Sequence, residues 1–106
     1  MTAPSGTGLR DNDMALIANA ARRIPEIRQV VLFGSRAKGA QMPGSDVDLA
    51  IKGDNLDYES AVRMAGILNE ETPMPYFFDV VNYETITEAP LREHIDRVGV
   101  VIYDRT

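Results

Sequence analysis

Two aspartates, Asp46 and Asp48, are separated by one residue in a segment that is otherwise largely aliphatic. Val47, Leu49 and Ile51 occupy the alternate positions of the same segment. Successive side chains of a β-strand point to opposite faces, so both carboxylates would project from one face while the aliphatic side chains pack against the other. Residues two apart in a strand lie about 6.5–7 Å apart at Cα, which lets both carboxylates reach one cation. The pattern therefore predicts a cation site on one face of a strand.

A third aspartate, Asp79, lies inside an apolar and aromatic segment, residues 76–81. Burying a carboxylate there without a partner would cost several kcal/mol, which indicates that Asp79 binds something. If this segment pairs with the strand of Asp46 and Asp48, three carboxylates converge. Such a set suits Mg²⁺, and phosphoryl or nucleotidyl transfer commonly uses two such ions. A solvent-facing pair of acids at a strand end is the alternative for Asp46 and Asp48, and these residues alone leave both interpretations open.

A glycine and a serine, Gly34 and Ser35, end the apolar segment that precedes the acidic one. Glycine lets the backbone approach a ligand closely, and the amides that follow, with the serine hydroxyl, can donate hydrogen bonds to phosphate oxygens. A helix beginning at Arg36 would add the positive end of its dipole. Arg36 and Lys38 are candidates for neutralising phosphate charge, with solvated loop cations as the alternative. This turn is therefore a candidate phosphate-binding element.

Helices and strands alternate along the chain and position these residues. We expect helices over residues 14–23, 57–69 and 90–98, and strands over residues 28–33, 46–52, 76–81 and 100–103. Asp13 is predicted to cap the first helix. The apolar stripe predicted for the second helix consists of Tyr58, Ala61, Val62, Ala65 and Leu68. The order of elements predicts an α/β (α+β) domain with a small mixed sheet of about four strands and helices packed on one face.

Composition limits the domain organisation and the partners. The chain has 106 residues, enough for one domain; residues 1–12 are predicted to form a flexible N-terminal tail and residues 13–106 a single domain. The net charge is −5 and the 11 Lys and Arg residues are scattered, so no long nucleic acid is expected as a partner. No apolar run is long enough to span a membrane, no leader is evident and there is no cysteine, so we expect no membrane association and a cytoplasmic location.

The only histidine, His94, falls between polar residues on the face of the last predicted helix. A histidine in such a position is more often solvated than catalytic. We therefore expect His94 to lie in solvent.

Residues Gly34–Gly39 and Ser45–Leu49 together resemble the signature of the DNA polymerase beta-like nucleotidyltransferase superfamily. The short chain and the segment 79–81 make it similar to minimal nucleotidyltransferases, which include the MntA-type antitoxins of HepT (HEPN-type) ribonuclease toxins. This resemblance implies the polymerase beta-like fold. It also implies that the Gly-Ser element holds the nucleotide phosphates. Lys38 departs mildly from the pattern, because relatives often carry arginine there and lysine cannot make the same bidentate phosphate contact.

The same resemblance implies roles for the three aspartates. Asp46, Asp48 and Asp79 would bind two Mg²⁺ ions and carry catalysis, with Asp79 also placed as the general base. The implied reaction is transfer of an NMP group, with AMP as the expected NMP, from ATP to a tyrosine hydroxyl of a HepT-like toxin. The two proteins would form a hetero-oligomer. Two alternatives stay open: a binding-only antitoxin that masks its toxin without catalysis, and a nucleotidyltransferase that acts on a small molecule such as an aminoglycoside.

Overall fold

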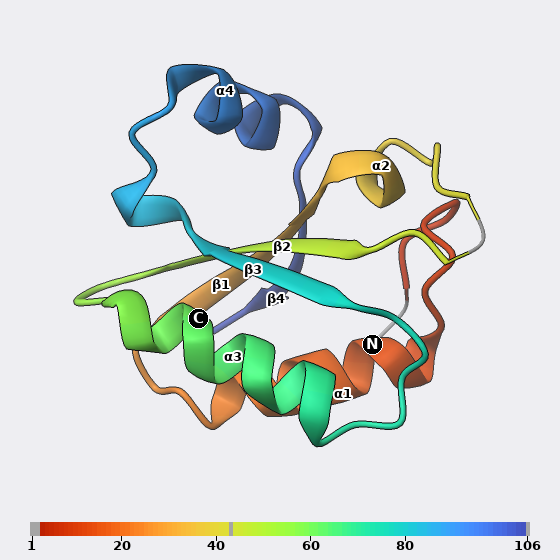
Figure 1. The fold of residues 1–106 in the computed structure, drawn as a ribbon, viewed down its shortest axis with the longest axis horizontal. Coiled ribbons are helices and arrows are strands. Elements are labelled where there is room, and N and C mark those ends of the chain that lie inside the picture. Colours follow the sequence, from red (N-terminus) through yellow and green to blue (C-terminus); the bar gives the residue numbers. More distant parts are fainter. Residues whose placement is uncertain (1–2, 43, 106) are drawn as a thin grey trace.

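A four-stranded mixed sheet forms the centre of the structure, a computed structural model that describes residues 3–42 and 44–105 (Figure 1). The strands are β1 (Ile27–Phe33), β2 (Val47–Gly53), β3 (Phe78–Asn82) and β4 (Val100–Asp104), in the order β3-β2-β1-β4. β2 and β3 are parallel, whereas β1 is antiparallel to both β2 and β4. The predicted mixed sheet of about four strands is therefore confirmed, with β3 and β4 at its edges.

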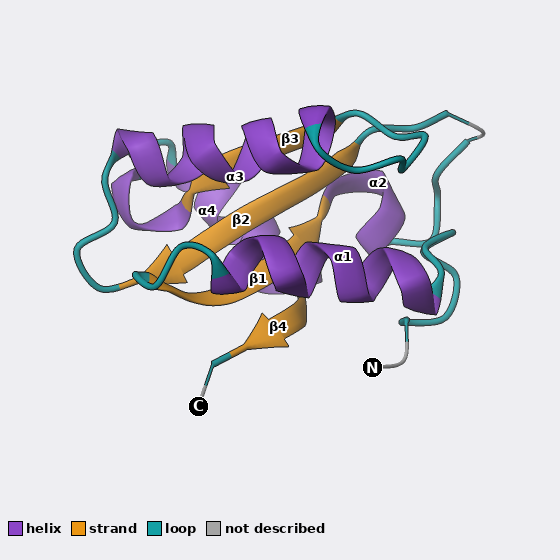
Figure 2. Ribbon diagram, turned by 90° about the horizontal axis from the view of Figure 1, so that it is seen from below, coloured by secondary structure: helices purple, strands orange, loops and turns teal. Residues whose placement is uncertain are grey.

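Two long helices cover one face of this sheet, as predicted. α1 (Asp11–Arg22) and α3 (Tyr58–Glu70) lie beneath the strands, and Figure 2 shows them side by side on that face. Their buried side chains meet alternate residues of β1 and β2 in the larger core, which includes Ile17, Leu32, Leu49, Met64 and Leu68. None of the helices in the described residues is long and apolar enough to cross a membrane.

A third helix, α4 (Ala89–Val98), lies on the opposite face of the sheet (Figure 1). Its Ile95 is buried in a second, smaller cluster with Val31, Phe33 and Ala50. This corrects the expectation that helices pack on one face only. The reason is that β1 is apolar at successive positions, Val30–Phe33, so that both of its faces require cover. Pro90 lies in the first turn of α4, where its missing N–H costs no hydrogen bond.

The buried stripe of α3 differs from the predicted one. Met64 and Ile67 are buried, whereas Tyr58 is 80% exposed and Val62 44% exposed. Both stripes contain Ala61 and Leu68, so a modest rotation of the helix selects between them. The observed rotation buries Met64 and Ile67 and leaves Tyr58, which carries a hydroxyl group, and Val62 on the surface.

The N-terminal residues also differ from the flexible tail expected for residues 1–12, of which residues 1 and 2 lie outside the described part. Thr7 and Leu9 are buried, and α1 begins at Asp11 rather than Met14. Asp13 is not the cap of α1 but lies in its first turn, where its carboxylate accepts a hydrogen bond of 2.9 Å from the backbone N–H of Arg10. This N-terminal segment is packed rather than free because its residues contact other parts of the fold; the carbonyl of Thr7, for example, accepts a hydrogen bond from Arg36.

Candidate active site

The order of the strands brings the aspartates that were predicted to bind a cation into one row across the sheet. Phe33, the last residue of β1, pairs with Asp48 of β2, and Asp48 pairs with Asp79 of β3. Paired residues of neighbouring strands point to the same face, here the face that carries α4. Asp46 lies just before β2 and two residues from Asp48, on the same alternation. The expectation that the third strand lies beside the second is therefore confirmed.

Gly34 completes this row at the end of β1. Its φ of +76° lies in the left-handed region, and a Cβ atom there would overlap the carboxylate of Asp48. Only glycine lets the backbone lie this close to Asp48. A single helical turn, α2 (Gly34–Ala37), follows at once, so the turn begins two residues before the predicted Arg36. Ser35 is the second residue of that turn and is half-buried.

The carboxylates of this row influence one another. Burial raises the pKa of Asp48 above its usual value, and the negative charges of Asp79 and Asp46 raise it further. A nearby His94 opposes these effects. Asp48 is half-buried, whereas Asp46 and Asp79 are exposed and can reach a ligand from solvent. The site therefore carries concentrated negative charge that a cation would balance.

The fit of this row to magnesium rests on donor chemistry rather than on a preassembled cage. Within residues 3–42 and 44–105, no three His, Cys, Asp or Glu side chains are gathered closely enough to hold a metal ion. Mutual repulsion opposes such gathering when no cation is present, because the charges of Asp79 and Asp46 add to burial in raising the pKa of Asp48. Carboxylate oxygens on one exposed face, beside a glycine that leaves room for a ligand, are the donors that Mg²⁺ prefers. The residues present therefore fit a divalent cation.

Arg36, predicted as a nucleotide ligand, has a different role in the structure. Its side chain is 4% exposed, and its Nε and Nη2 donate hydrogen bonds of 3.3 and 2.8 Å to the carbonyl of Ser45. Nη1 donates to the carbonyl of Thr7 at 2.8 Å, and the guanidinium lies 4.8 Å from the centre of the Tyr76 ring. These hydrogen bonds and its burial make Arg36 a support for the residue before Asp46 rather than a side chain open to a ligand in solvent. The prediction for Arg36 is corrected accordingly.

The structure places Lys38 in solvent and His94 against Phe33, at the end of the row. Lys38 is exposed and follows the last residue of α2, so its ammonium group is free to meet a ligand in solvent. His94 is half-buried rather than solvated, and its ring contacts the ring of Phe33 edge-to-face with 6.1 Å between centres. Sequence reasoning missed this neighbour of Asp48. The available signal was its spacing from Leu91 and Val98, three residues before and four after, which puts it beside the inner stripe of α4.

A buried polar contact ties the N-terminal residues to this site. The Tyr76 hydroxyl donates a hydrogen bond of 3.0 Å to the carboxylate of Asp13, whose side chain is fully buried. Tyr76 in turn packs its ring against Arg36. We call Asp13, Tyr76, Arg36 and Thr7 the N-terminal brace. The brace connects α1 and the N-terminal segment to the loop that carries Asp46.

Replacing Asp13 tests the brace through pH. Burial would raise the pKa of Asp13, but hydrogen bonds from the Arg10 backbone, the Arg10 side chain and Tyr76 outweigh it and hold the pKa below its usual value. A lowered pKa means that the carboxylate stabilises the fold above the unfolded-state pKa, and that this is lost as the pH falls through the folded-state value. Asp13→Asn is expected to lower the free energy of unfolding by about 1.5–3 kcal/mol at pH 7, measured by urea unfolding.

The difference between wild type and Asp13→Asn should begin to shrink near the unfolded-state pKa of about 4 and should vanish once the pH has fallen through the lowered folded-state pKa of Asp13. Glu59→Gln is the control, because Glu59 is an exposed acid in the first turn of another helix. A loss that does not vary with pH, or one equal to that of Glu59→Gln, would contradict the role of the brace.

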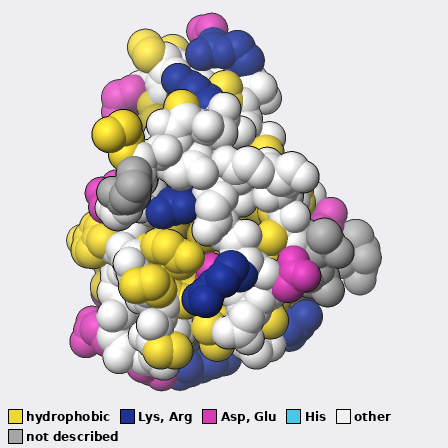
Figure 3. Space-filling view, turned by 90° about the vertical axis from the view of Figure 1, so that its right-hand side faces the viewer, with side chains coloured by type: hydrophobic (Ala, Val, Ile, Leu, Met, Phe, Trp, Pro, Cys, Tyr) yellow, Lys and Arg dark blue, Asp and Glu magenta, His cyan; other side chains and the backbone are white. Residues whose placement is uncertain are grey.

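The surface beside α2 and the N-terminal segment carries mixed charge. Figure 3 shows Lys and Arg side chains of this face separated by acidic, hydrophobic and uncharged surface. A long nucleic acid requires a continuous basic stripe. The described part of the chain shows no such stripe on this face (Figure 3).

Comparisons with known proteins agree with this geometry. The probable protein adenylyltransferase MntA of Haemophilus influenzae is 29% identical over 106 residues, which cover 99% of this chain and 91% of that protein. A crystal structure of a toxin-antitoxin with AMP-PNP shares the fold with a TM-score of 0.74 and 23% identity, covering 89% of this chain and 75% of the other. The structure of a tri-AMPylated Shewanella oneidensis HEPN toxin in complex with MNT antitoxin gives 0.62 and 20%, over 87% and 73% of the two chains.

A family model covers most of the chain. The model described as "Polymerase beta, Nucleotidyltransferase" matches residues 15–106, which include α2 and all four strands of the sheet. The row from Gly34 to Asp79 lies wholly within this match. The chain therefore belongs to the polymerase beta nucleotidyltransferase family and is a nucleotidyltransferase.

Proposed function

We propose that this nucleotidyltransferase moves an NMP group, with AMP as the expected NMP, from ATP to a tyrosine hydroxyl of a HepT-like ribonuclease toxin. It thereby acts as the antitoxin of that toxin. The observation that carries the proposal is the row of Gly34, Asp48 and Asp79 across three adjacent strands. Support comes from the likeness to the probable protein adenylyltransferase MntA over nearly the full chain. The AMPylated toxin in one structure of the same fold points to the same acceptor class.

The row divides the reaction among the residues of this chain. The backbone amides after Gly34 and the Ser35 hydroxyl would bind the β- and γ-phosphates of ATP, and Lys38 would add positive charge beside them. Asp79 would accept the proton of the tyrosine hydroxyl. The tyrosine oxygen then forms a bond to the α-phosphorus, the bond from that phosphorus to the β-phosphate oxygen breaks, and pyrophosphate leaves.

Asp46, Asp48 and Asp79 are the residues that would hold two magnesium ions. Bound magnesium would neutralise phosphate charge and polarise the phosphoryl oxygens. A bound cation would also stabilise the ionised carboxylates, since it would offset the burial and the repulsion from Asp79 and Asp46 that raise the pKa of Asp48. We further propose that the chain and its toxin form a hetero-oligomer in the cytoplasm, where ATP is supplied.

Intact-mass spectrometry tests this function. Purified chain is incubated with a purified HepT-like toxin, MgCl₂ and each of the four NTPs separately. The expected result is a gain in toxin mass in units of one AMP with ATP, and no gain when the acceptor tyrosine of the toxin is replaced by phenylalanine. EDTA in place of MgCl₂ is expected to abolish the gain.

Other outcomes would replace this proposal. A stable complex that neutralises the toxin without any gain in mass would identify a binding-only antitoxin. Modification of an aminoglycoside in a parallel incubation, with the toxin unchanged, would identify a small-molecule nucleotidyltransferase. A gain with another NTP would keep the reaction and change the nucleotide.

A further inference from the structure

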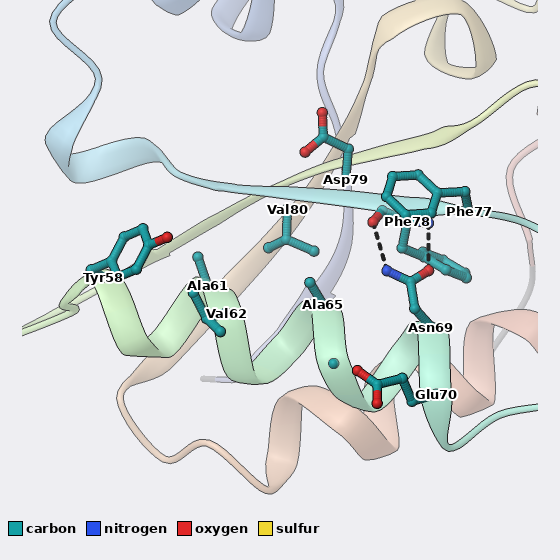
Figure 4. Close-up of a pocket in the computed structure, with 11 residues that line it drawn as sticks. Tyr58, Ala61, Val62, Ala65, Asn69, Glu70, Phe77, Phe78, Asp79 and Val80 are labelled. Atoms are coloured by element: carbon teal, nitrogen blue, oxygen red, sulfur yellow. Dashed lines mark hydrogen bonds between the residues drawn. The ribbon is translucent and has the colours of Figure 1, made fainter.

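Three exposed apolar side chains surround a groove between α3 and β3. Phe77 is 60% exposed, Tyr58 80% and Val62 44%. Together with Asp79 they line a groove of about 380 Å³, whose floor includes Ala65 and Val80 (Figure 4). Single exposed apolar residues are ordinary, whereas a group around a groove marks an interaction site. We call Phe77, Tyr58 and Val62 the β3-edge surface.

The direction of nucleotidyl transfer points to this surface. The attacking oxygen and the leaving group lie roughly in line on opposite sides of the reacting phosphorus. In the proposed function the leaving pyrophosphate is held at Gly34 and Ser35, which follow β1, while the general base Asp79 lies on β3. β2 lies between these strands, and β3 is the edge of the sheet. An acceptor hydroxyl must therefore arrive over the β3 edge.

Phe77 is the residue that such an acceptor meets beside Asp79. The carbonyl of Phe77 already accepts a hydrogen bond of 2.9 Å from the N–H of Val47, so the alternation of β3 extends back to it. Phe77 and Asp79 consequently share the face of the aspartate row, about 6.5–7 Å apart at Cα. Figure 4 shows Asp79 on one side of β3 and Val80 on the other, directed toward α3. The surface thus wraps around the edge and leads to Asp79.

The backbone of this edge is partly occupied, which determines how a partner can bind. Asn69 of α3 donates a hydrogen bond of 3.0 Å to the carbonyl of Phe78 and accepts one of 2.8 Å from its N–H (Figure 4). The carbonyl of Phe77 points toward β2, where it accepts the hydrogen bond from Val47. The N–H and carbonyl of the next residue, Phe78, therefore point away from β2, toward the open edge of the sheet. Adding another strand along the edge would require Asn69 to be displaced. Contacts through side chains remain available.

The charge of the groove defines the chemistry of the partner further. Its charged lining residues, Glu70 and Asp79, are both acidic. A segment with an aromatic ring and basic neighbours would complement both the apolar rim and this charge. We propose that the β3-edge surface binds the segment of the partner protein that carries the acceptor tyrosine, with Phe77 packed against the ring of that tyrosine. This inference rests on the proposed function and names the acceptor-binding surface of the same site.

Phe77→Ala and Val101→Ala form a matched pair of variants for the test. Val101 is a similarly exposed apolar residue, 50% exposed, on β4 at the opposite edge of the sheet. The dissociation constant for a purified HepT-like toxin is measured by calorimetry without nucleotide, and KM is measured for toxin and for ATP. Phe77→Ala is expected to raise the toxin dissociation constant and KM about 10- to 30-fold, as for an aromatic anchor. Phe77→Ala should change neither the Tm nor the KM for ATP. Val101→Ala should behave as wild type, and Phe77→Tyr, which keeps an aromatic ring, should bind the toxin as wild type does.

Each contrary result has a distinct meaning. An unchanged toxin dissociation constant for Phe77→Ala would overturn the docking surface and leave the proposed transfer intact. A rise in KM for ATP alone would also overturn it, since Phe77 would then contact the nucleotide base. If wild type binds toxin but transfers no AMP, the proposed function fails, while the comparison of dissociation constants still decides whether the toxin docks on the β3-edge surface.

Discussion

Asp48→Asn is expected to reduce NMP transfer at least about 100-fold while leaving the protein folded and no less stable. The loss follows because Asp48 is the central carboxylate of the row, and magnesium chemistry is worth several kcal/mol in the transition state, each ~1.4 kcal/mol being tenfold in rate. Stability behaves oppositely. The pKa of Asp48 is raised by burial and by the neighbouring acids Asp79 and Asp46, so its ionised form destabilises the fold above that pKa. Removing the charge removes this penalty.

The pH dependence separates the two effects of Asp48→Asn. At pH 7 the Tm of the variant should equal or exceed that of wild type in metal-free buffer. This advantage should disappear below about pH 4, where the wild-type carboxylate is protonated as well. Asp104→Asn is the control, since Asp104 is an exposed acid at the end of β4. Transfer at near the wild-type rate would remove Asp48 from the metal-binding set, and a lower Tm at pH 7 would contradict charge repulsion in the row.

The row of acids was accessible from sequence because it depends on backbone alternation alone. Asp46 and Asp48 occupy alternate positions of one strand, and Asp79 lies inside another segment of β-branched and aromatic residues. Once β2 and β3 pair, the alternation places Asp48 opposite Asp79. No knowledge of distant side chains was needed, and the sheet was predicted for the same reason.

Arg36 and His94 were misjudged because their roles depend on partners far along the chain. Arg36 is bound by carbonyls 9 and 29 residues away and by the ring of Tyr76. A basic residue after Gly-Ser has the same appearance in sequence whether it binds phosphate or braces a loop. His94 lies near Asp48 only because α4 covers the face that was expected to be open. Spacing within α4 indicates that His94 lies beside the inner stripe of that helix, but it does not indicate which side chains of the sheet that stripe meets.

The stripe of α3 shows the limit of periodicity within one element. Tyr58 and Val62 fit a helical period as well as Met64 and Ile67 do, and the packing against α1 and β3 selects the second pair. The consequence is functional as well as structural. The rejected pair stays on the surface, where it joins Phe77 around the groove that leads to Asp79.

Gly34→Ala is expected to impair both stability and transfer, because two effects act at this position. The φ of +76° costs a residue with a Cβ about 1–2 kcal/mol. The new Cβ would also displace the carboxylate of Asp48, with which it would overlap. A displacement of about 1 Å in a catalytic group can cost ~100-fold in rate, so a loss of this size is expected in the AMP-transfer assay.

A double-mutant cycle isolates the contact with Asp48 from the backbone cost. Gly6→Ala serves as the reference, since Gly6 has a φ of +80° and nothing within 4 Å of an added Cβ. Gly34→Ala should lower the free energy of unfolding more than Gly6→Ala does. In an Asp48→Ala background the carboxylate is absent and only the Cβ of residue 48 remains near the added Cβ, at 3.3 Å, so the cost of Gly34→Ala should fall toward that of Gly6→Ala. Equal costs in both backgrounds would mean that Gly34 is required only for its backbone conformation, and the close approach of the turn to Asp48 would lose its role in aligning the row.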